Sequence, residues 1–457
     1  MNLDQFTTRT LQEISQGEII QRVLVAALRA VDPAVAVVRH VVRDTDLLKI
    51  GDKTWNLNLV KHVWLVGAGK AGAPMAHAAA KILGDVITAG VVVVKDGYAG
   101  KVQEMLPDRI KILEAGHPLP DQRGVDATGE IIQILERAER DDLVICLLSG
   151  GGSALMTAPD DGISLDDLQQ TTASLLACGA SIDEINTLRK HLDRVKGGGL
   201  ARFAAPAELV ALILSDVVGD PLDTIASGPT VADPSSFADA LEILRRYHLE
   251  SQIPAAVIAH LSAGQAGKLL ETPKAGDAIF EWVNNLIIGS NRHAAMAGLA
   301  EAHACGLNPL LLTTYLQGEA RQVGRSLAAV ARQLANSDHP LPRPACIAAG
   351  GESTVVVRGD GLGGRNLEVA LGAVPEMAGL VDVFLVTLAT DGGDGPTDAA
   401  GAVVSGETLH RATELSLVSW DFLERNDSYH FFAALGDLLK PGPTQTNVND
   451  LAFLFAF

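Results

Sequence analysis

Residues 143–156 have the sequence LVICLLSGGGSALM, in which a run of six apolar residues leads into three consecutive glycines between two serines. An unbroken apolar run of this length is typical of a strand that is buried on both faces of a parallel sheet. Gly150, Gly151 and Gly152 leave the backbone of the following turn bare, so another group can approach it closely. The stretch therefore predicts a central strand of an α/β domain with a binding loop at its carboxyl end.

Apolar runs and helical patterns alternate on both sides of this stretch. Further strands are predicted at residues 63–69, 90–97, 110–116 and 209–216. Amphipathic segments such as GVDATGEIIQILERAER lie between them. Strands that alternate with helices in this way predict a doubly wound parallel sheet with helices on both faces.

A second alternation follows a looser segment at residues 250–280, which carries prolines and glycines. Its apolar runs lie at residues 284–291, 308–320, 345–357 and 383–402. We therefore predict an N-terminal α/β domain at residues 1–260 and a second α/β domain at residues 280–430. The final segment, TQTNVNDLAFLFAF, pairs a polar loop with an apolar strand that could join either sheet.

The composition indicates a cytoplasmic protein that binds small molecules. The 457 residues carry 36 basic against 55 acidic side chains, a net charge of -19, which argues against binding to nucleic acid or to an anionic membrane. No apolar run reaches the roughly 20 residues of a membrane span, and the N-terminus lacks the pattern of a signal peptide. The four cysteines are far apart in the sequence and are expected to be reduced.

The loop at residues 67–72, GAGKAG, follows a predicted strand and opens a helix. It fits the G-x-G-x-x-G pattern, and Asp96 at the end of the next strand is where a dinucleotide site would place its ribose ligand. A purely structural turn is an equal alternative. Lys70 within the loop favours binding of phosphate beside the backbone amides at a helix N-terminus, which also suits phosphoryl transfer.

The SGGGS loop lacks the Gly-Lys-Ser/Thr ending of a Walker motif, but its successive amides could form an anion-binding nest, with hydroxyls from Ser149 and Ser153. A tight turn beneath a packed helix is the alternative. Basic side chains that could neutralise an anion stand at Arg189, Lys190, Lys196 and Arg365. His117 could act as an acid or base, or simply hold a turn through hydrogen bonds.

Acidic residues end several of the predicted strands. Asp216 and Asp391 lie at two such positions, with Glu352 in a glycine-rich loop between them. Carboxylate oxygens are suitable ligands for Mg²⁺. Helix caps and turns are the alternative explanation for each loop taken singly.

Nine motifs occur in order along the chain: GAGKA, AGHPLPD, LLSGGGSAL, INTLRKHLDRVKGGGLA, SDVVGDPLDTIASGPT, GGEST, GGRNLEVAL, TDGGDGPTDAAGA and TNVNDL. Together they resemble the glycerate 2-kinase family with a MOFRL C-terminal domain, the class II glycerate kinases, whose members are often labelled hydroxypyruvate reductases. The resemblance implies an ATP- and Mg²⁺-dependent kinase that converts D-glycerate to 2-phosphoglycerate. It further implies a Rossmann-like N-terminal domain, a second α/β (MOFRL) domain and an active site in the cleft between them.

The resemblance also implies roles for particular residues. The family's catalytic lysine and arginine fall on Lys70 and Arg365, and residues 430–457 are expected to return to the N-terminal domain. Three positions depart from the usual family residue: Leu367 replaces glutamine, Val218 replaces proline and Gln445 replaces glycine. Leu367 leaves open any polar contact that a glutamine would make.

We assign the candidate residues as follows. Catalysis is assigned to Lys70, Arg365 and Asp216. Substrate or phosphate binding is assigned to Ser149, Gly150, Gly151, Gly152, Ser153, Arg189, Lys190 and Lys196. Nucleotide binding is assigned to Gly67, Gly69, Glu352, Asn366, Asn447, Asn449 and Asp450, and Mg²⁺ binding to Asp216 and Asp391.

Two other functions stay open at this point. One is an NAD(P)H-dependent reductase of hydroxypyruvate or tartronate semialdehyde, which would use GAGKAG and Asp96. The other is a regulatory protein that binds a sugar acid without turnover. The sequence also leaves open whether the 2- or the 3-hydroxyl of glycerate is phosphorylated, and whether the chain forms a homodimer.

Overall fold

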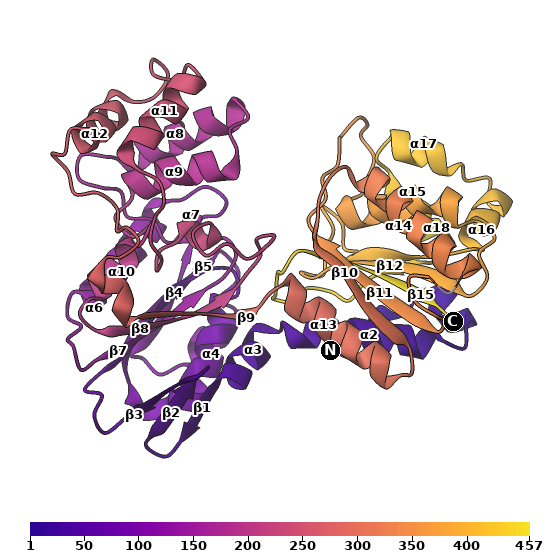
Figure 1. Ribbon diagram of the computed structural model, residues 1–457, viewed down its shortest axis with the longest axis horizontal. Coiled ribbons are helices and arrows are strands. Elements are labelled where there is room, and N and C mark those ends of the chain that lie inside the picture. The colour runs from indigo at the N-terminus through magenta and orange to yellow at the C-terminus, as the bar shows by residue number, and fades with distance from the viewer. Residues whose placement is uncertain (338) are drawn as a thin grey trace. The chain divides into compact units, whose positions relative to one another are not determined.

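The computed structural model describes residues 1–337 and 339–457, which divide into two compact units. The N-terminal unit comprises residues 33–215 and 220–288, and the C-terminal unit comprises residues 1–32, 216–219 and 289–457. Each unit is built around a six-stranded sheet (Figure 1). The predicted pair of α/β domains is therefore confirmed.

The main sheet of the N-terminal unit has the strand order β6-β5-β4-β7-β8-β9. Its strands are β4 (Val63–Ala68), β5 (Ile87–Lys95), β6 (Ile110–Ala115), β7 (Leu143–Leu148), β8 (Glu208–Leu214) and β9 (Val283–Gly289). The pairs from β6 through to β8 are all parallel. The chain runs outward from β4 to β6 and then returns to start β7 on the other side of β4. Ligands of doubly wound sheets bind at such a reversal of strand order.

Helices and a small antiparallel sheet complete the N-terminal unit. The small sheet has the order β1-β2-β3 and consists of β1 (Val41–Asp44), β2 (Leu47–Ile50) and β3 (Lys53–Asn56). The helices are α3 (Pro33–His40), α4 (Gly72–Leu83), η2 (Gly84–Val86), α5 (Val102–Met105), α6 (Gln122–Leu135), α7 (Gly152–Leu155), α8 (Leu165–Ala177), α9 (Ile182–Leu192), α10 (Gly199–Ala204), η3 (Ile225–Ser227), α11 (Phe237–Arg246), α12 (Ala255–Gln265) and η4 (Ala278–Trp282).

Four of these helices, α8, α9, α11 and α12, form a helical layer at one end of the unit (Figure 1). Capping boxes set the starts of three of them: Ser164 with Asp167, Ser181 with Glu184, and Ser236 with Asp239. Their apolar faces share one hydrophobic core, which includes leucines of α8 and α9. This core is separate from the main sheet. Side chains of α8 and α9 can therefore line a cavity together with residues of the loop that follows β7.

The sheet of the C-terminal unit has the order β10-β11-β15-β12-β13-β14. Its strands are β10 (Asn308–Leu316), β11 (Ala345–Gly351), β12 (Val383–Ala389), β13 (Gly401–Ser405), β14 (Leu438–Leu439) and β15 (Asp450–Ala456). Strand β10 is parallel to β11, and the other neighbours are antiparallel. The sheet is therefore mixed.

Helices cover both faces of this sheet (Figure 1). The helices are η1 (Leu3–Phe6), α1 (Arg9–Glu13), α2 (Gly17–Ala30), α13 (Asn291–Ala304), α14 (Ala320–Asn336), α15 (Arg365–Met377), α16 (Thr408–Glu414), α17 (Ser419–Glu424) and α18 (Ser428–Leu435). One face packs with α14, α15 and α18 into a single core. On the other face Gly298 of α13 lies so near Phe453 that a Cβ would be 2.8 Å from the phenyl Cζ.

The structure differs from the predicted domain limits at three places. Strand β9, predicted to open the second domain, forms the edge of the first sheet. Residues 450–456, which were expected to return to the N-terminal domain, form a central strand between β11 and β12. Residues 1–32 also belong to the C-terminal unit, where the Thr446 hydroxyl donates to the Val31 carbonyl at 2.7 Å.

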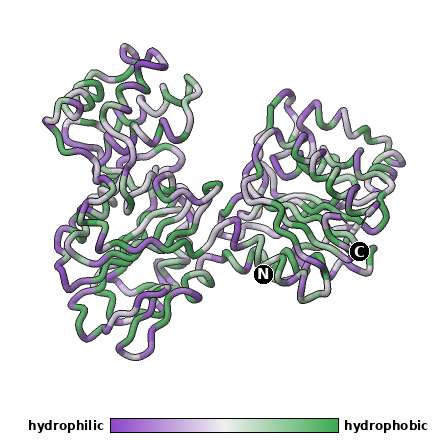
Figure 2. The backbone as a smooth tube through the Cα atoms, viewed as in Figure 1, coloured by the Kyte–Doolittle hydropathy of each residue, from purple (hydrophilic) through white to green (hydrophobic). Residues whose placement is uncertain are grey.

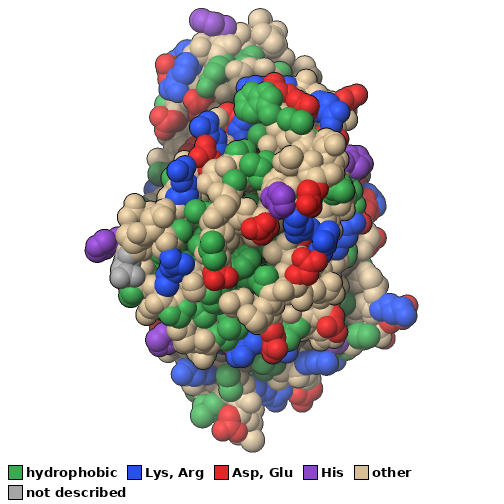
Figure 3. Space-filling model, turned by 90° about the vertical axis from the view of Figure 1, so that its right-hand side faces the viewer, with side chains coloured by type: hydrophobic (Ala, Val, Ile, Leu, Met, Phe, Trp, Pro, Cys, Tyr) green, Lys and Arg blue, Asp and Glu red, His purple; other side chains and the backbone are tan. Residues whose placement is uncertain are grey.

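The distribution of hydropathy explains these placements. Strand β15 is buried at six of its seven positions, so it requires a neighbour on each side and cover on both faces. Figure 2 shows hydrophobic segments gathered in the sheets. Figure 3 shows acidic, basic and hydrophobic side chains interspersed over the face that it draws. No helix within the described residues is long and apolar enough to span a bilayer.

Candidate active site

The loops that follow β4 and β7 meet at the point where the strand order reverses. The Lys70 amide donates to the Gly150 carbonyl at 2.9 Å, and the Ala71 amide donates to the Ser149 hydroxyl at 3.0 Å. Gly69 has φ +137°, and a Cβ there would lie 2.1 Å from Ser149 Oγ. The two glycine-rich motifs of the sequence thus form one structure, which only glycine at position 69 allows.

Lys70 and His117 lie beside Gly151 in this structure. A Cβ on Gly151, whose φ is +83°, would be 2.9 Å from His117 Cδ2 and 3.5 Å from Lys70 Cγ. Burial, together with the positive charges of Lys70 and Lys95, lowers the pKa of His117 to about 4. His117 is therefore neutral at pH 7. Within the described residues, no hydrogen bond or ion pair engages the Lys70 ammonium.

A segment that follows β8 joins the same cluster. Ser153 Oγ lies 2.7 Å from Ser227 Oγ, and the Ser227 hydroxyl donates to Asn186 Oδ1 at 2.9 Å. Ala226 and Ser227 have φ of 51° and 62°, in the left-handed region that non-glycine residues seldom occupy. Strain of this kind is common at functional sites, where the surrounding contacts hold it in place.

The basic residues predicted to bind phosphate have different environments. Lys196 Nζ is 2.7 Å from Asp193 Oδ2 and also donates to the Met156 carbonyl at 2.9 Å. Lys190 Nζ is 3.3 Å from Asp233 Oδ1. Both lysines and both of their aspartate partners are buried. The sequence interpretation missed Asp193 and Asp233, because nothing in their spacing marks them as partners of these lysines.

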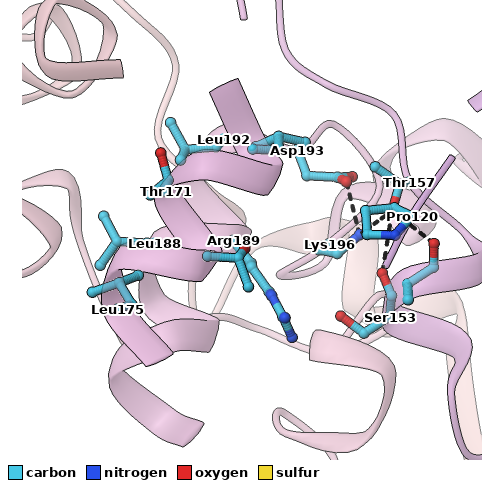
Figure 4. A pocket seen from close by; sticks show the side chains of 13 residues that line it. Pro120, Ser153, Thr157, Thr171, Leu175, Leu188, Arg189, Leu192, Asp193 and Lys196 are labelled. Atoms are coloured by element: carbon cyan, nitrogen blue, oxygen red, sulfur yellow. Dashed lines mark hydrogen bonds and ion pairs between the residues drawn. The ribbon is translucent and has the colours of Figure 1, made fainter. Parts of the chain in front are cut away.

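Arg189 lies in a small cavity with Lys196 and Ser153 (Figure 4). The cavity has a volume of about 30 Å³, and one of its walls consists of leucines from α8 and α9. In Figure 4 the Arg189 side chain leaves α9 on the side of the cavity where Ser153 lies. The structure thus brings Arg189, Ser153 and Lys196 together.

Arg365 is the centre of a second cluster, in the C-terminal unit. It opens α15, and its guanidinium pairs with Glu352 and with Asp450, whose Oδ2 is 3.0 Å from Arg365 Nε. Asn366 Nδ2 donates to Asp450 Oδ1 at 2.8 Å. Arg365, Glu352, Asn366 and Asp450, all predicted site residues, are therefore in contact with one another.

Asp394 holds the start of α15. It accepts hydrogen bonds from the backbone amides of Asn366 at 3.1 Å and Leu367 at 2.8 Å. A Cβ on Gly364 would lie 2.4 Å from the Asp394 Cγ, which explains the glycine before Arg365. The Leu367 side chain is fully buried in the core, so its position faces apolar groups and offers no polar contact to a ligand.

Burial raises the pKa of two carboxyl groups in this cluster. The pKa of Asp450 rises to about 7 because the group is buried, although Arg365 and Asn366 favour its ionised form. The pKa of Asp394 rises to about 6 for the same reason. Burial alone would lower the pKa of Arg365, but the Asp450 and Glu352 carboxylates raise it overall. The guanidinium is therefore fully charged beside carboxyl groups that titrate near neutral pH.

The TNVND segment before β15 is held by backbone contacts. Asn447 Oδ1 accepts from the Asn449 amide at 3.0 Å, and the Asn449 carbonyl accepts from the Thr390 hydroxyl at 2.7 Å. Asn449 has φ 65° and is buried. Asn291 Nδ2 donates to the Asp450 carbonyl at 2.9 Å. Asn291 was not predicted as a site residue, and its place against this loop follows only from the packing of α13.

The two residues predicted to bind Mg²⁺ lie in loops. Asp216 follows β8, and Asp391 follows β12, where it is exposed and accepts from the Gly393 amide at 3.3 Å. Among the described residues, no group of three or more His, Cys, Asp or Glu side chains could hold a metal ion. Mg²⁺ bound together with a nucleotide needs only one or two carboxylates, because the phosphates supply further oxygens. Carboxylate oxygens are of the kind that Mg²⁺ prefers, and binding of the ion by Asp216 and Asp391 stays a prediction.

The features of a dinucleotide site are occupied by other contacts. Arg123 engages both oxygens of Asp96, at 2.6 and 2.8 Å. A Cβ on Gly67 would lie 2.2 Å from the Leu147 carbonyl, and one on Gly72 would lie 2.7 Å from Val92 Cγ1. Both glycines are thus needed for close packing of the sheet and helix α4. The structural explanation of the G-x-G-x-x-G pattern accounts for these two positions.

Comparison with known proteins shows relatives along nearly the whole chain. A glycerate 2-kinase of Pyrococcus horikoshii is 40% identical over 435 residues, which cover 95% of this chain and 96% of that protein. The chain belongs to the glycerate 2-kinase family. Within it, residues 19–262 match the domain of unknown function DUF4147 and residues 345–450 match the MOFRL family.

Other members of the glycerate 2-kinase family agree in fold. The crystal structure of a glycerate kinase from Thermotoga maritima has a TM-score of 0.85 and 40% identity, with 95% of this chain and 98% of that chain covered. A relative from Agrobacterium vitis, 40% identical over 97% of this chain and 95% of its own length, carries a provisional hydroxypyruvate reductase name. The MOFRL match ends at Asp450, so it covers all the predicted site residues of the C-terminal unit from Glu352 onward.

Proposed function

We propose that this protein is a glycerate 2-kinase that transfers the γ-phosphoryl group of ATP to D-glycerate. The observation that carries the proposal is Lys70, at the reversal of strand order, whose side chain has no hydrogen-bond or ion-pair partner among residues 1–337 and 339–457, in a chain 40% identical to a named glycerate 2-kinase. The Lys70 side chain lies beside Gly151 of the SGGGS loop. Such a place favours an anionic ligand, because the lysine charge and backbone amides act together.

Phosphoryl transfer requires positioning and charge stabilisation more than covalent chemistry. In this proposal Lys70 and the backbone amides of Gly150, Gly151 and Ser153 hold a phosphoryl group, and Arg365 stabilises the negative charge that develops during transfer. The amides of Ser149 and Gly152 donate to the carbonyls of Ala68 and Ser149, each at 3.1 Å, and are not available to a ligand. Asp216 orients the acceptor hydroxyl. The geometry around Arg365 assigns Glu352 and Asp450 to positioning its guanidinium.

Nucleotide and metal binding complete the proposal. Gly69, Asn366, Asn447 and Asn449 contribute the polar loop backbone and side chains assigned to nucleotide binding. Asp216 and Asp391 would hold Mg²⁺ with the nucleotide phosphates, and the ion would neutralise charge on those phosphates. Lys190 and Lys196 do not contact the ligand in this scheme, because buried carboxylates already pair with them; they support the residues around the site.

The remaining parts of the proposal concern the setting of the enzyme. All four cysteines are free thiols, which supports a reducing compartment such as the cytoplasm. Formation of 2-phosphoglycerate, rather than the 3-phospho isomer, is proposed from the family membership. A homodimer is proposed as the assembly, and its mass in solution tests it.

The deciding experiment measures ADP from ATP, Mg²⁺ and D-glycerate by anion-exchange chromatography, so that NADH is not needed as a reporter. Parallel reactions contain hydroxypyruvate with NADH or NADPH. We expect ADP that depends on glycerate, and ³¹P NMR of the product places the phosphate. Oxidation of NADH or NADPH without any ADP would refute the kinase and support the reductase. Stabilisation by glycerate with neither reaction would support a binding protein.

A further inference from the structure

The cavity beside α9 contains a cation, Arg189, that has no close carboxylate partner in the described part of the chain. Within the described residues, no hydrogen bond or ion pair engages the Arg189 guanidinium. Burial lowers its pKa, and Asp193 is the carboxylate that opposes this effect from a distance. Arg189 is partly buried, and a partly buried cation without a close partner destabilises a protein, so its presence needs an explanation.

Asp193 is not available to neutralise Arg189. Its Oδ2 lies 2.7 Å from Lys196 Nζ and accepts from the Ala158 amide at 3.1 Å, while its Oδ1 accepts from the Val195 amide at 3.1 Å. The charged groups that line the cavity are Arg189, Lys196 and Asp193. Two cations and one anion leave one positive charge, which one carboxylate would balance.

The cavity is small, and one of its walls is largely apolar. Its volume is about 30 Å³. A carboxylate is planar and presents two oxygens to a guanidinium, and it needs less room than a tetrahedral phosphoryl group with three terminal oxygens. One wall includes Leu168, Leu175, Leu188 and Leu192, whose side chains have no hydrogen-bonding groups.

We infer that Arg189 binds the carboxylate of the acceptor acid in this cavity, which Ser153 of the SGGGS loop also lines. The inference rests on the proposed function and adds a basis for substrate choice. Through Arg189 of α9, the helical layer would select acceptors that carry a carboxylate. Arginine suits this role because its planar fork matches a carboxylate in two parallel hydrogen bonds. A neutral acceptor of similar size should therefore be a poor substrate.

The test uses the full chain and the variants Arg189→Gln and Arg189→Lys. The matched control is Arg194→Gln, because Arg194 is an exposed arginine five positions further along that stacks on Phe203. Loss of charge-assisted hydrogen bonds should raise the KM for D-glycerate about 10- to 100-fold in Arg189→Gln, with the KM for ATP unchanged. Arg189→Lys should recover part of the loss. The control should match the wild type.

D-Glyceramide, the neutral amide of the acid, provides the second arm. The wild type should prefer glycerate to glyceramide, and Arg189→Gln should lose most of this preference because only the carboxylate interaction is removed. An arginine with a merely structural role would leave the preference intact. An unchanged KM for glycerate in an active Arg189→Gln variant would overturn the inference while the kinase stands.

Thermal stability separates the remaining outcomes. Without ligand, Arg189→Gln should melt at or above the wild-type temperature, since it removes a partly buried charge that no close carboxylate balances among the described residues. With glycerate alone, the wild type should be stabilised and the variant should not. If the wild type has no kinase activity but shows this stabilisation, the proposed function fails and the carboxylate site stands. Equal stabilisation of both proteins would refute the site.

Discussion

Replacement of Asp450 by asparagine should make the protein more stable at alkaline pH and less active. Burial raises the pKa of Asp450 from 3.8 to about 7. At 1.36 kcal/mol per pH unit, this difference corresponds to about 4 kcal/mol of lost folding free energy once the group is ionised. The folded protein binds this proton more tightly than the unfolded chain. The stability that the protonated Asp450 side chain contributes is therefore fully present below about pH 4 and is lost as the pH rises to about 7.

The magnitude can be measured as a difference between two proteins. The free energy of unfolding of Asp450→Asn should exceed that of the wild type, and the gap should widen by about 3 kcal/mol between pH 5 and pH 8. Urea denaturation at pH 5, 6, 7 and 8 gives both values. Asp360→Asn, which alters an exposed loop carboxylate of the same unit, should show no such widening. A gap that is constant or narrows with pH would refute the burial argument.

The same variant should lose activity, because Arg365 loses the carboxylate that lies 3.0 Å from its Nε. A misplaced catalytic group commonly costs about 100-fold in rate, so kcat should fall at least about tenfold while the protein becomes more stable. Stability gained together with activity lost would identify Asp450 as a positioning residue. Full activity in a stable variant would remove Asp450 from the proposed mechanism.

Three further substitutions test the N-terminal unit. Lys70→Ala should reduce kcat at least about 100-fold with an unchanged melting temperature, because no protein partner is lost; near-normal turnover would exclude Lys70 from catalysis. Gly69→Ala should cost about 2 kcal/mol or more in urea denaturation, since its Cβ would overlap Ser149, and a neutral result would contradict this packing. Asp193→Asn should cost about 3–5 kcal/mol by leaving Lys196 buried without its carboxylate; a loss below about 1 kcal/mol would show that the pair relaxes.

Much of the site could be predicted because its residues lie in loops that follow apolar strands. Lys70 and Ser149 each come directly after such a run, and parallel strands bring their carboxyl ends to one edge. Arg365 was identifiable from the glycines before it and its place at a helix start. These features depend on a few neighbouring residues, which the sequence contains in full.

Partners that belong to distant segments were not predictable in the same way. Lys190 and Lys196 have the composition of phosphate ligands, yet buried Asp233 and Asp193 neutralise them. Arg189, which comes immediately before Lys190 in the sequence, was indistinguishable from them. Which of three cations stays unpaired depends on where each side chain points after α9 packs, and no spacing rule contains that information.

The sequence by itself determined the two α/β units, the parallel order of the first sheet and the loops that carry Lys70 and Arg365, because apolar periodicity and glycine placement are local properties. Only the tertiary structure decided that β15 lies at the centre of the C-terminal sheet, since an apolar strand can be buried equally well in either sheet. It also decided which charges are neutralised. Burial makes an unpaired charge costly, and the pairing that avoids this cost is set by contacts between segments far apart in the chain.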